Sequence, residues 1–420
     1  MKALLSGNEA IARGVYEAGV RVAVGYPGTP STEILENVVR YKDVVYCEWS
    51  PNEKVAFEVA AGACYTGARA IVTMKHVGLN VAADPLMTLT YVGTVGGLVA
   101  IVADDPGMHS SQNEQDTRNY ARLAKIPVLE PSDSTDARDF LVAGMDISEK
   151  FKTPVILRTT TRVAHSRSLV ELSERVEHEP EGFKKNPPQF VTIPAWARPM
   201  HVKIEQRLLD MAAAASVSPL NRIEWGDKKL GIITNGIAYQ YVKEIFPEAS
   251  VLKLGWSYPF PDELIRQFAA GVEKLLVVEE LDAFIEEHVR SLGIACDGKN
   301  LVPNVGELSP MTLQTIRAKM EGKPLPAFGP VEQVKTLPPR PPVLCPSCPH
   351  RAVFAALGKF DVIVSGDIGC YSLGASAPLS RIDTILCMGG GISVAHGMKV
   401  AGEKKRVVGV LGDSTFFHSG

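Results

Sequence analysis

Three cysteines toward the end of the chain have the residue type and spacing for metal or redox chemistry. Cys345 and Cys348 are separated by two residues, and Cys370 follows a predicted strand over 362–364. Thiolates bind iron and zinc, and a Cys-x-x-Cys pair outside a disulfide-rich chain usually belongs to a metal or redox site. The pattern therefore predicts a metal centre, with a set of unliganded thiols as the alternative.

The identity of that metal is open between two choices. Three cysteines cannot complete a four-cysteine iron–sulfur site, so a fourth thiolate would come from residues after Gly420 or from Cys387. Zinc bound by the same thiolates together with His350 is the rival. We favour the iron–sulfur cluster over zinc.

A carboxylate close to the last residue has a position suited to magnesium. The apolar run over 406–411 leads directly into Gly412-Asp413-Ser414. An open α/β sheet presents such a carboxylate at the carboxyl end of a strand, where ligands bind. Mg²⁺ keeps several waters and takes few protein ligands, so Asp413 and a diphosphate would suffice to hold it. The remaining ligands are expected after Gly420, and the sequence resembles a polypeptide cut within a cofactor site.

A loop rich in proline and glycine over 26–33 combines hydroxyl groups with a helix start. Gly28 and its neighbouring prolines fix the turn, while Thr29, Ser31 and Thr32 supply hydroxyls. Free N–H groups at a helix N-terminus bind anions, so the loop is a candidate cradle for an anionic substrate or a diphosphate. A helix N-cap formed by Ser31 or Thr32 is the alternative.

Glu53 opens the helix that we expect over 54–65. Ser50, Pro51 and Glu53 have the spacing of a capping box, with Ser50 at the N-cap and Glu53 at the third helical position. From position alone, the cap is the favoured explanation. The alternative is a carboxylate at a strand-to-helix corner that forms a hydrogen bond with a heterocycle.

A polar loop over 104–118 follows the strand expected over 98–103. This loop and the residues after it contain His109, Arg118 and Arg122. These side chains are candidates for binding a substrate carboxylate, which arginine contacts in a bidentate manner. An exposed surface loop is the alternative, although the carboxyl end of a strand is where α/β sites form.

A glycine triplet that includes Gly390 and Gly391 follows a strand expected over 382–387. Glycines allow a phosphate to approach the backbone closely, but a triplet is also typical of a tight loop. By itself this signal is weak.

These residues require alternating strands and helices to position them. Segments rich in Ala and Glu separate the apolar runs, which indicates a mostly parallel sheet covered by helices. The strands expected in the first part of the chain lie over 20–24, 44–49, 69–74, 98–103 and 154–159. Later strands are expected over 230–233, 251–254 and 274–278, with helices over 238–245, 262–270 and 283–292.

The pattern divides the chain into several parts and predicts a multi-domain α/β fold. The expected parts are a first domain over 1–190, a connecting region over 191–227 with a helix over 204–215, a second α/β domain over 228–325, a proline-rich linker over 326–343 and an incomplete third domain over 344–420.

Composition excludes several classes of protein. The chain has 420 residues, of which 45% are hydrophobic and 22% charged, as in ordinary globular proteins of several domains. A net charge of −3 gives no argument for binding nucleic acid or an anionic membrane surface. The N-terminus lacks the features of a signal peptide, and the longest nearly apolar stretch, over 92–103, is too short to span a bilayer. We expect a soluble, cytoplasmic protein.

Taken in order, these motifs resemble the 2-oxoacid:ferredoxin oxidoreductases that depend on thiamine diphosphate, and in particular the large (α) subunit of the indolepyruvate type. The resemblance covers nearly the whole chain. It rests on the segments over 25–33, 345–351, 365–370 and 412–414 and on the helix that begins near Glu53. It implies transketolase-like domains: a pyrimidine-binding domain over 1–190, a transketolase C-terminal-like domain over 228–325 and the start of a diphosphate-binding domain over 344–420.

The resemblance also implies roles for single residues. Glu53 would form a hydrogen bond with the pyrimidine ring and promote ylid formation, which reverses the preference for a helix cap. Thr29 matches the residue near the substrate's carboxylate and keto oxygen, and Arg118 aligns with a substrate-binding position. Asp413 matches the magnesium ligand of a Gly-Asp-Gly motif, with Ser414 in place of the last glycine. The further cofactor contacts are Gly28, Gly390, Gly391 and Gly412.

The implied reaction is the ferredoxin-dependent, CoA-linked oxidative decarboxylation of an aryl pyruvate. It would require thiamine diphosphate, Mg²⁺ and [4Fe–4S] clusters in the full-length protein, with CoA as co-substrate. The implied partners are a smaller β subunit and ferredoxin, with no nucleic acid and no membrane.

Two other functions compete with this one. A non-oxidative thiamine diphosphate-dependent 2-oxoacid decarboxylase needs no cluster, so Cys345, Cys348 and Cys370 argue against it. The second is a non-catalytic assembly fragment that only binds its partner subunit. Because the family's cluster domain and the asparagine that completes the magnesium site are absent from residues 1–420, we expect this fragment to be inactive alone.

Overall fold

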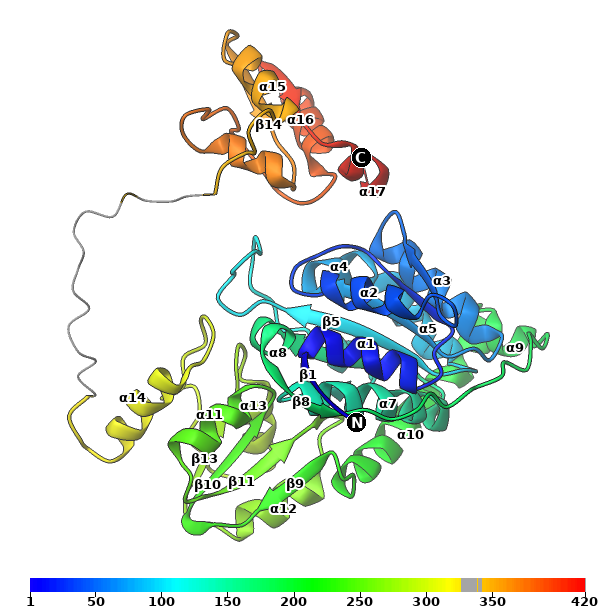
Figure 1. The fold of residues 1–420 in the computed structure, drawn as a ribbon, viewed down its shortest axis with the longest axis vertical. Helices are drawn as coiled ribbons and strands as arrows, with labels where there is room; N and C mark the ends of the chain where they lie inside the picture. The colour runs from blue at the N-terminus through cyan, green and yellow to red at the C-terminus, as the bar shows by residue number, and fades with distance from the viewer. Residues whose placement is uncertain (326–337, 339–341, 420) are drawn as a thin grey trace. The chain divides into compact units, whose positions relative to one another are not determined.

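The computed structural model describes residues 1–325, 338 and 342–419. The chain forms two compact units, with unit 1 comprising residues 1–327 and unit 2 residues 328–420 (Figure 1). The proline-rich linker predicted over 326–343 lies largely outside the described residues.

A seven-stranded sheet forms the centre of unit 1. Six of its strands are parallel, and the seventh, β12, pairs antiparallel with β6 at one edge. The spatial order is β12 (Trp256–Tyr258), β6 (Val128–Leu129), β7 (Val155–Thr160), β5 (Leu98–Asp104), β4 (Ala70–Lys75), β2 (Val22–Gly25) and β3 (Tyr46–Trp49). The predicted α/β fold with a mostly parallel sheet is therefore confirmed.

Side chains along the central strands alternate between two hydrophobic cores. In β5, Val99 and Ile101 belong to one core, whereas Ala100 and Val102 belong to the other. The helices divide in the same way: α1 (Gly7–Glu17) and α7 (Ser134–Phe151) contribute to the first core, and α3 (Glu53–Tyr65) and α5 (Ala83–Val92) to the second. Burial on both faces explains why these strands are nearly continuous apolar runs.

A second, four-stranded sheet lies in the later part of unit 1. Its order is β13 (Leu275–Val278), β10 (Asp227–Asn235), β11 (Ala249–Leu254) and β9 (Asn221–Glu224), of which β9 is antiparallel. The helices of this region are α11 (Ala238–Ile245), α12 (Asp262–Ala270), α13 (Phe284–Ser291) and α14 (Pro310–Met320). This region is joined to the first sheet, because β12 lies between α12 and β11 in the sequence yet pairs with β6.

Shorter elements complete unit 1. They are β1 (Lys2–Ser6) paired with β8 (Arg167–Glu171), and the helices α2 (Thr32–Val38), α4 (His76–Val81), α6 (Arg118–Ala124), α8 (Thr161–His165), α9 (Pro187–Phe190) and α10 (Pro194–Ser216). The helix α10 begins well before the predicted range of 204–215. Pro194 occupies its first turn, where a missing N–H costs no hydrogen bond, and the helix continues through Pro199 in its interior.

Unit 2 has a small core of its own. The strands β14 (Val362–Ser365) and β15 (Arg406–Gly409) are parallel, and a crossover containing α16 (Gly390–Val400) connects them. The helix α15 (Pro349–Leu357) precedes β14, and α17 (Asp413–Ser419) follows β15. The buried core residues are Leu344, Phe354, Val364, Tyr371 and Val410.

The strand predicted over 382–387 is wrong. This segment makes a single bridge between Thr384 and Ser365, and its apolar side chains Ile385 and Leu386 are exposed. One bridge cannot hold a strand in register, so the apolar run remains irregular. Among the described helices, none combines the length and apolar character needed to cross a bilayer.

Candidate active site

The carboxyl ends of the parallel strands in unit 1 bring together segments that are far apart in the sequence. Gly28 and Thr29 follow β2, Glu53 follows β3, and Lys75 ends β4. The loop from Asp105 onward follows β5. In a parallel sheet these ends lie along one edge, which is where open α/β folds bind ligands.

The loop after β2 uses its hydroxyl groups internally. Gly28 N donates to Thr32 Oγ1 at 2.9 Å, and Ser31 Oγ donates to the Gly28 carbonyl at 2.7 Å. Neither hydroxyl forms the predicted side-chain cap of α2. Thr29 is exposed, and its carbonyl accepts a hydrogen bond from Ser110 Oγ at 3.3 Å. The contact of Thr29 with a ligand stays a prediction, to which its exposure is no obstacle.

Glu53 is the first residue of α3, and its side chain is buried, with 7% exposed. The predicted capping box is wrong, because Asn52 is the N-cap and its Oδ1 accepts from Val55 N at 2.8 Å. Asn52 lies two residues after Ser50, so Glu53 moves from the third helical position to the first. The capping box therefore does not explain the presence of a glutamate at position 53.

Gly78 makes room for the Glu53 carboxylate. A Cβ atom at position 78 would lie 2.5 Å from Glu53 Oε1 and 2.7 Å from its Cγ. A buried carboxylate at the carboxyl edge of a sheet, approached closely by Gly78, fits the need of an aminopyrimidine ring for a fixed hydrogen-bonding partner. The residues present therefore fit thiamine diphosphate at this position.

Lys75 and His76 were not singled out from the sequence, and both are buried at the same edge. Burial lowers the pKa of Lys75, while the charge of Asp105 acts in the opposite direction. His76 Nε2 lies 3.2 Å from the carbonyl oxygen of Asn113. The available signal was the pair Lys75-His76 at the end of an apolar run, at a strand's carboxyl end.

Asp105 organises the loop after β5. Its carboxylate accepts from Ser110 N at 2.9 Å, Ser111 Oγ at 2.6 Å and Thr161 Oγ1 at 2.8 Å. Burial raises the pKa of Asp105, but these hydrogen bonds outweigh it and the net shift is downward. The loop is therefore held in a defined shape over the strand end.

The cationic candidates of this loop are placed differently from one another. His109 is exposed, and its Nε2 lies 3.2 Å from Glu307 Oε2. Arg122 is exposed on α6. Arg118 is completely buried, so it does not share a surface with either of them.

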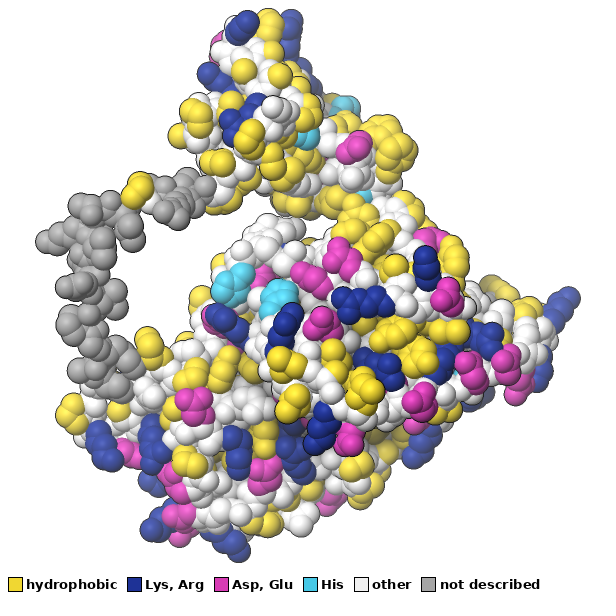
Figure 2. All heavy atoms as spheres, viewed as in Figure 1, with side chains coloured by type: hydrophobic (Ala, Val, Ile, Leu, Met, Phe, Trp, Pro, Cys, Tyr) yellow, Lys and Arg dark blue, Asp and Glu magenta, His cyan; other side chains and the backbone are white. Residues whose placement is uncertain are grey.

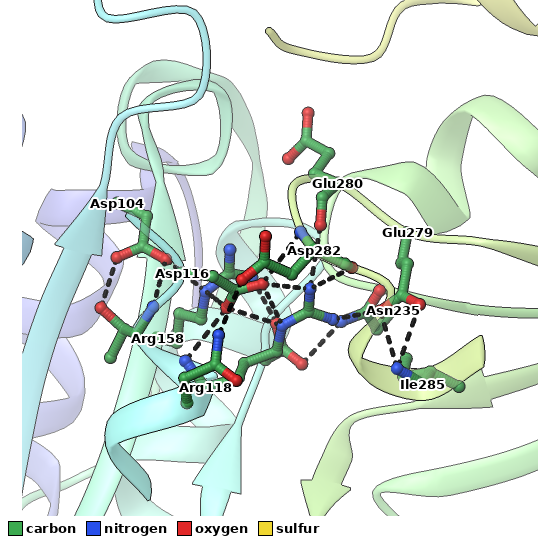
Figure 3. A network of polar contacts seen from close by, with 12 residues as sticks. Asp104, Asp116, Arg118, Arg158, Asn235, Glu279, Glu280, Asp282 and Ile285 are labelled. Carbon is green, nitrogen blue, oxygen red and sulfur yellow. Dashed lines mark hydrogen bonds and ion pairs between the residues drawn. The ribbon is translucent and has the colours of Figure 1, made fainter. Parts of the chain in front are cut away.

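Arg118 belongs to a buried polar network (Figure 3). Its Nε and Nη2 contact Asp116, the latter at 2.5 Å from Oδ2, and its Nη1 donates to Glu279 Oε2 at 2.6 Å. Arg118 Nη2 also donates to the Glu280 carbonyl at 2.9 Å. The bidentate contact predicted with a substrate carboxylate is made instead with Asp116, so here Arg118 joins the two sheet regions of unit 1.

Arg158 extends this network on the side of the first sheet. It donates from Nε to Asp104 Oδ2 at 2.6 Å and from Nη1 to Glu130, which in turn accepts from Asn235 Nδ2 at 2.6 Å. Against the effect of burial, the guanidinium groups of Arg118 and Arg158 lower the pKa of Asp116 to about 2. Burial raises the pKa of Glu280 to about 7.

In unit 2, Asp413 is the first residue of α17 and is exposed. Ser414 N donates to its Oδ1 at 2.8 Å. A Cβ at Gly412 would lie 2.9 Å from the Tyr371 ring, so this position requires glycine. An exposed carboxylate after a strand fits a magnesium ligand.

The glycine triplet of unit 2 is bound by Asp367, a fully buried residue. Gly389 N and Gly391 N each donate to the Asp367 carboxylate at 2.8 Å, and Gly390 N donates to the Cys387 carbonyl at 3.0 Å. These amides are engaged within the chain, and the contact of Gly390 and Gly391 with a cofactor stays a prediction.

The three cysteines are not grouped in unit 2. Cys345 and Cys370 are exposed, and Cys348 Sγ lies 3.6 Å from His350 Nδ1. Among the described residues no three His, Cys, Asp or Glu side chains are arranged to hold a metal ion. The iron–sulfur cluster and the zinc alternative therefore stay predictions.

Comparison with known families gives the class of the protein. Residues 13–207 match the family described as pyruvate flavodoxin/ferredoxin oxidoreductase, thiamine diphosphate-binding, and residues 367–420 match the C-terminal thiamine pyrophosphate-binding domain of thiamine pyrophosphate enzymes. The fold and these matches define a thiamine diphosphate-binding oxidoreductase.

Individual relatives narrow this class. The chain is 45% identical to the indolepyruvate oxidoreductase subunit IorA of Pyrococcus horikoshii and 44% identical to that of Archaeoglobus fulgidus, in both cases over 100% of this chain and 71% of the relative. The chain belongs to this family of indolepyruvate oxidoreductase large subunits. Identity falls to 23%, over 72% of this chain, for the ketoisovalerate oxidoreductase subunit VorB of Methanothermobacter marburgensis.

A solved structure supports the fold. The 2-oxoglutarate:ferredoxin oxidoreductase of Magnetococcus marinus aligns with a TM-score of 0.62 and 18% identity, over 76% of this chain and 65% of that chain. At this level of identity the likeness concerns the fold alone.

Proposed function

We propose that this chain is the part of a two-subunit enzyme that carries out ferredoxin-dependent, CoA-linked oxidative decarboxylation of aryl pyruvates. The observation that carries the proposal is the pairing of whole-chain identity to the IorA subunits with a buried Glu53 at the sheet edge. The substrate class follows from the names of those relatives. The balanced reaction is 2-oxoacid, CoA and two oxidised ferredoxins to acyl-CoA, CO₂, two reduced ferredoxins and a proton.

Thiamine diphosphate, when bound, supplies the electron sink for the loss of CO₂. Glu53 would hold the aminopyrimidine ring through a hydrogen bond and keep a proton at that contact. Thr29, exposed beside Ser110, would orient the substrate's keto acid group. Asp413, with Gly412 and Ser414, would bind Mg²⁺ and the diphosphate, and Gly28, Gly390 and Gly391 would let the cofactor approach the backbone.

Electrons must leave one at a time to ferredoxin, which calls for iron–sulfur clusters. Cys345, Cys348 and Cys370 are the proposed ligands in this chain, with a further thiolate to complete a [4Fe–4S] cluster. We also propose a smaller partner subunit, ferredoxin as the electron acceptor and a cytoplasmic location. The partner subunit is supported by the names of the relatives, which are described as subunits of an oxidoreductase.

The test of the substrate class is a comparison of 2-oxoacids. The complete two-subunit enzyme is assayed under anaerobic conditions for CoA-dependent reduction of ferredoxin, with acyl-CoA identified by mass spectrometry. Indolepyruvate and phenylpyruvate should exceed pyruvate, 2-oxoglutarate and 2-oxoisovalerate in kcat/KM by at least tenfold. A preference for an aliphatic 2-oxoacid would refute the aryl pyruvate assignment.

A further inference from the structure

Lys75 is a buried cation at the proposed substrate edge. It is the last residue of β4, and 7% of it is exposed. Its side chain runs along the loop after β2, because a Cβ at Gly28 would lie 3.0 Å from Lys75 Cβ and 3.7 Å from its Cδ. The ammonium group is therefore carried past Gly28 toward the segment that contains Thr29.

Neutral oxygens of one residue are the contacts of this ammonium group. Lys75 Nζ donates to the Ser110 carbonyl at 3.1 Å and to Ser110 Oγ at 3.2 Å. Ser110 Oγ in turn lies 3.3 Å from the Thr29 carbonyl. The carboxylate of Asp105 is close enough to act on Lys75 electrostatically, but its oxygens bind Ser110 N, Ser111 and Thr161.

The buried Arg118, Arg158 and Lys253 differ from Lys75 because each forms an ion pair with a carboxylate. Within the described residues, Arg118 is paired with Asp116 and Glu279, Arg158 with Asp104, and Lys253 with Asp136. No ion pair among the described residues includes Lys75. A buried charge without a counter-ion is costly, and such groups are retained where they bind a charged ligand.

We propose that Lys75 binds the carboxylate of the 2-oxoacid substrate through its ammonium group. In the absence of substrate, Ser110 accepts the hydrogen bonds of this ammonium group. This inference rests on the proposed function. It assigns to Lys75 the contact that sequence reasoning gave to Arg118, whose guanidinium is already paired. A flexible lysine held by two weak, neutral acceptors exchanges them readily for a carboxylate.

The inference is tested with an unreactive carboxylate and its neutral analogue. Binding of 3-(indol-3-yl)propionate and of its primary amide to the complete two-subunit enzyme is measured by calorimetry, so turnover is not required. In Lys75→Met the Kd of the acid should rise about 10- to 100-fold, and that of the amide by less than about twofold. Lys75→Arg should recover most of the affinity for the acid.

Two controls separate this result from a loss of structure. Lys54→Met removes an exposed lysine of α3 and should leave both Kd values unchanged. If Lys75→Met fails to fold, Lys75→Gln replaces it and should show the same preference. Equal effects on acid and amide, or a wild-type enzyme that does not prefer the acid, would overturn the proposal.

Steady-state kinetics of the Lys75→Met variant test the same contact independently of the binding measurement. With an aryl pyruvate, Lys75→Met should raise KM about 10- to 100-fold with a smaller change in kcat, because the contact exists before the reaction begins. An enzyme that binds the acid through Lys75 but oxidises no 2-oxoacid would refute the proposed function and leave the carboxylate site standing. The two failures are therefore distinguishable.

Discussion

At the scale of the residue, the structure gives Glu53 a place that a helix cap does not explain. Its carboxylate is buried at the first position of α3, behind an N-cap formed by Asn52. Gly78 lies against it so closely that no other residue type fits without displacement. This arrangement holds a buried carboxylate at the carboxyl edge of the parallel sheet.

Replacement of the Glu53 carboxyl group should abolish most of the activity without unfolding the protein. Glu53→Gln keeps the shape but cannot exchange a proton with the pyrimidine ring, so kcat should fall about 10²- to 10⁴-fold. Glu58→Gln is the matched control, because Glu58 is exposed on the same helix and pairs with Lys54. Activity of Glu53→Gln within a few fold of the wild type would exclude this assignment.

The close approach of Gly78 to Glu53 predicts a second effect. In Gly78→Ala the new Cβ would press against Glu53 Oε1, which should displace the carboxylate and weaken thiamine diphosphate binding about tenfold or more. Repacking should also cost about 1–3 kcal/mol of stability. Gly62→Ala is the control, since nothing lies within 4 Å of that Cβ, and it should be neutral or slightly stabilising. Equal cofactor affinity in both variants would contradict the prediction.

At the scale of the element, the buried network joins the first sheet to the second. Arg118 at the start of α6 reaches Glu279 after β13, and Arg158 on β7 binds Asp104 on β5. The strand β12 crosses from the later region into the first sheet by pairing with β6. Unit 1 is therefore held together by shared strands and by buried ion pairs.

Breaking this network should destabilise unit 1. Arg118→Met leaves Asp116 and Glu279 buried without their partner, which should lower the free energy of unfolding by about 3–5 kcal/mol. Arg122→Met removes an exposed arginine of the same helix and should change stability by less than about 0.5 kcal/mol. The free energies of unfolding of both variants are measured by denaturant titration and compared with that of the wild type. If Arg118→Met retained full stability while its KM rose, Arg118 would be a substrate ligand after all.

Glu280 should make stability depend on pH. Burial raises its pKa from 4.5 to about 7, so the folded state holds a proton that the unfolded state releases between these values. Protonated Glu280 therefore contributes its full stabilisation below about pH 4.5. This stabilisation is lost as pH rises through about 7, because the buried side chain then becomes charged. Glu280→Gln should be more stable than the wild type at pH 8, by about 1–3 kcal/mol. The exposed Glu287→Gln should show no such gain, and equal pH profiles of wild type and Glu280→Gln would refute the prediction.

The elements that sequence predicted best are those whose signal is local. The strands over 98–103 and 154–159 are apolar runs because both of their faces are buried, and a run of this kind can be read without knowing its neighbours. The strands β6 and β12 have three residues or fewer, and pairing with distant strands forms them, so no local pattern marks them.

The site was predictable in part for the same reason. Thr29 and Glu53 lie in a recognisable loop and helix start, and the structure brings both to the expected edge. The buried ion pairs of Arg118 were not predicted, because its partner Glu279 lies 161 residues away in the sequence. Lys75 was not singled out, because its burial and its contacts with Ser110 depend on the fold and are marked by no local motif.

At the scale of the whole molecule, the two family matches fall in different units. The match over 13–207 lies in unit 1, and the match over 367–420 lies in unit 2. Each unit has its own hydrophobic core. The division of the chain thus follows the two parts of a thiamine diphosphate enzyme.

The surface differs between the units. On the viewed face of unit 1, basic and acidic side chains are intermixed with hydrophobic ones (Figure 2). Unit 2 exposes more apolar side chains for its size, including Phe360, Leu386, Val400 and Phe417.

The chain spans 71% of the length of its IorA relatives.

The ratio of electrons to CO₂ tests the central claim most directly. The complete two-subunit enzyme, prepared anaerobically, is given an aryl pyruvate, CoA and oxidised ferredoxin, and reduced ferredoxin and CO₂ are measured in the same reaction. Oxidative decarboxylation predicts about two reduced ferredoxins for each CO₂, with acyl-CoA as the product. Release of CO₂ with an aldehyde product and no reduction of ferredoxin would contradict the account and establish a non-oxidative decarboxylase.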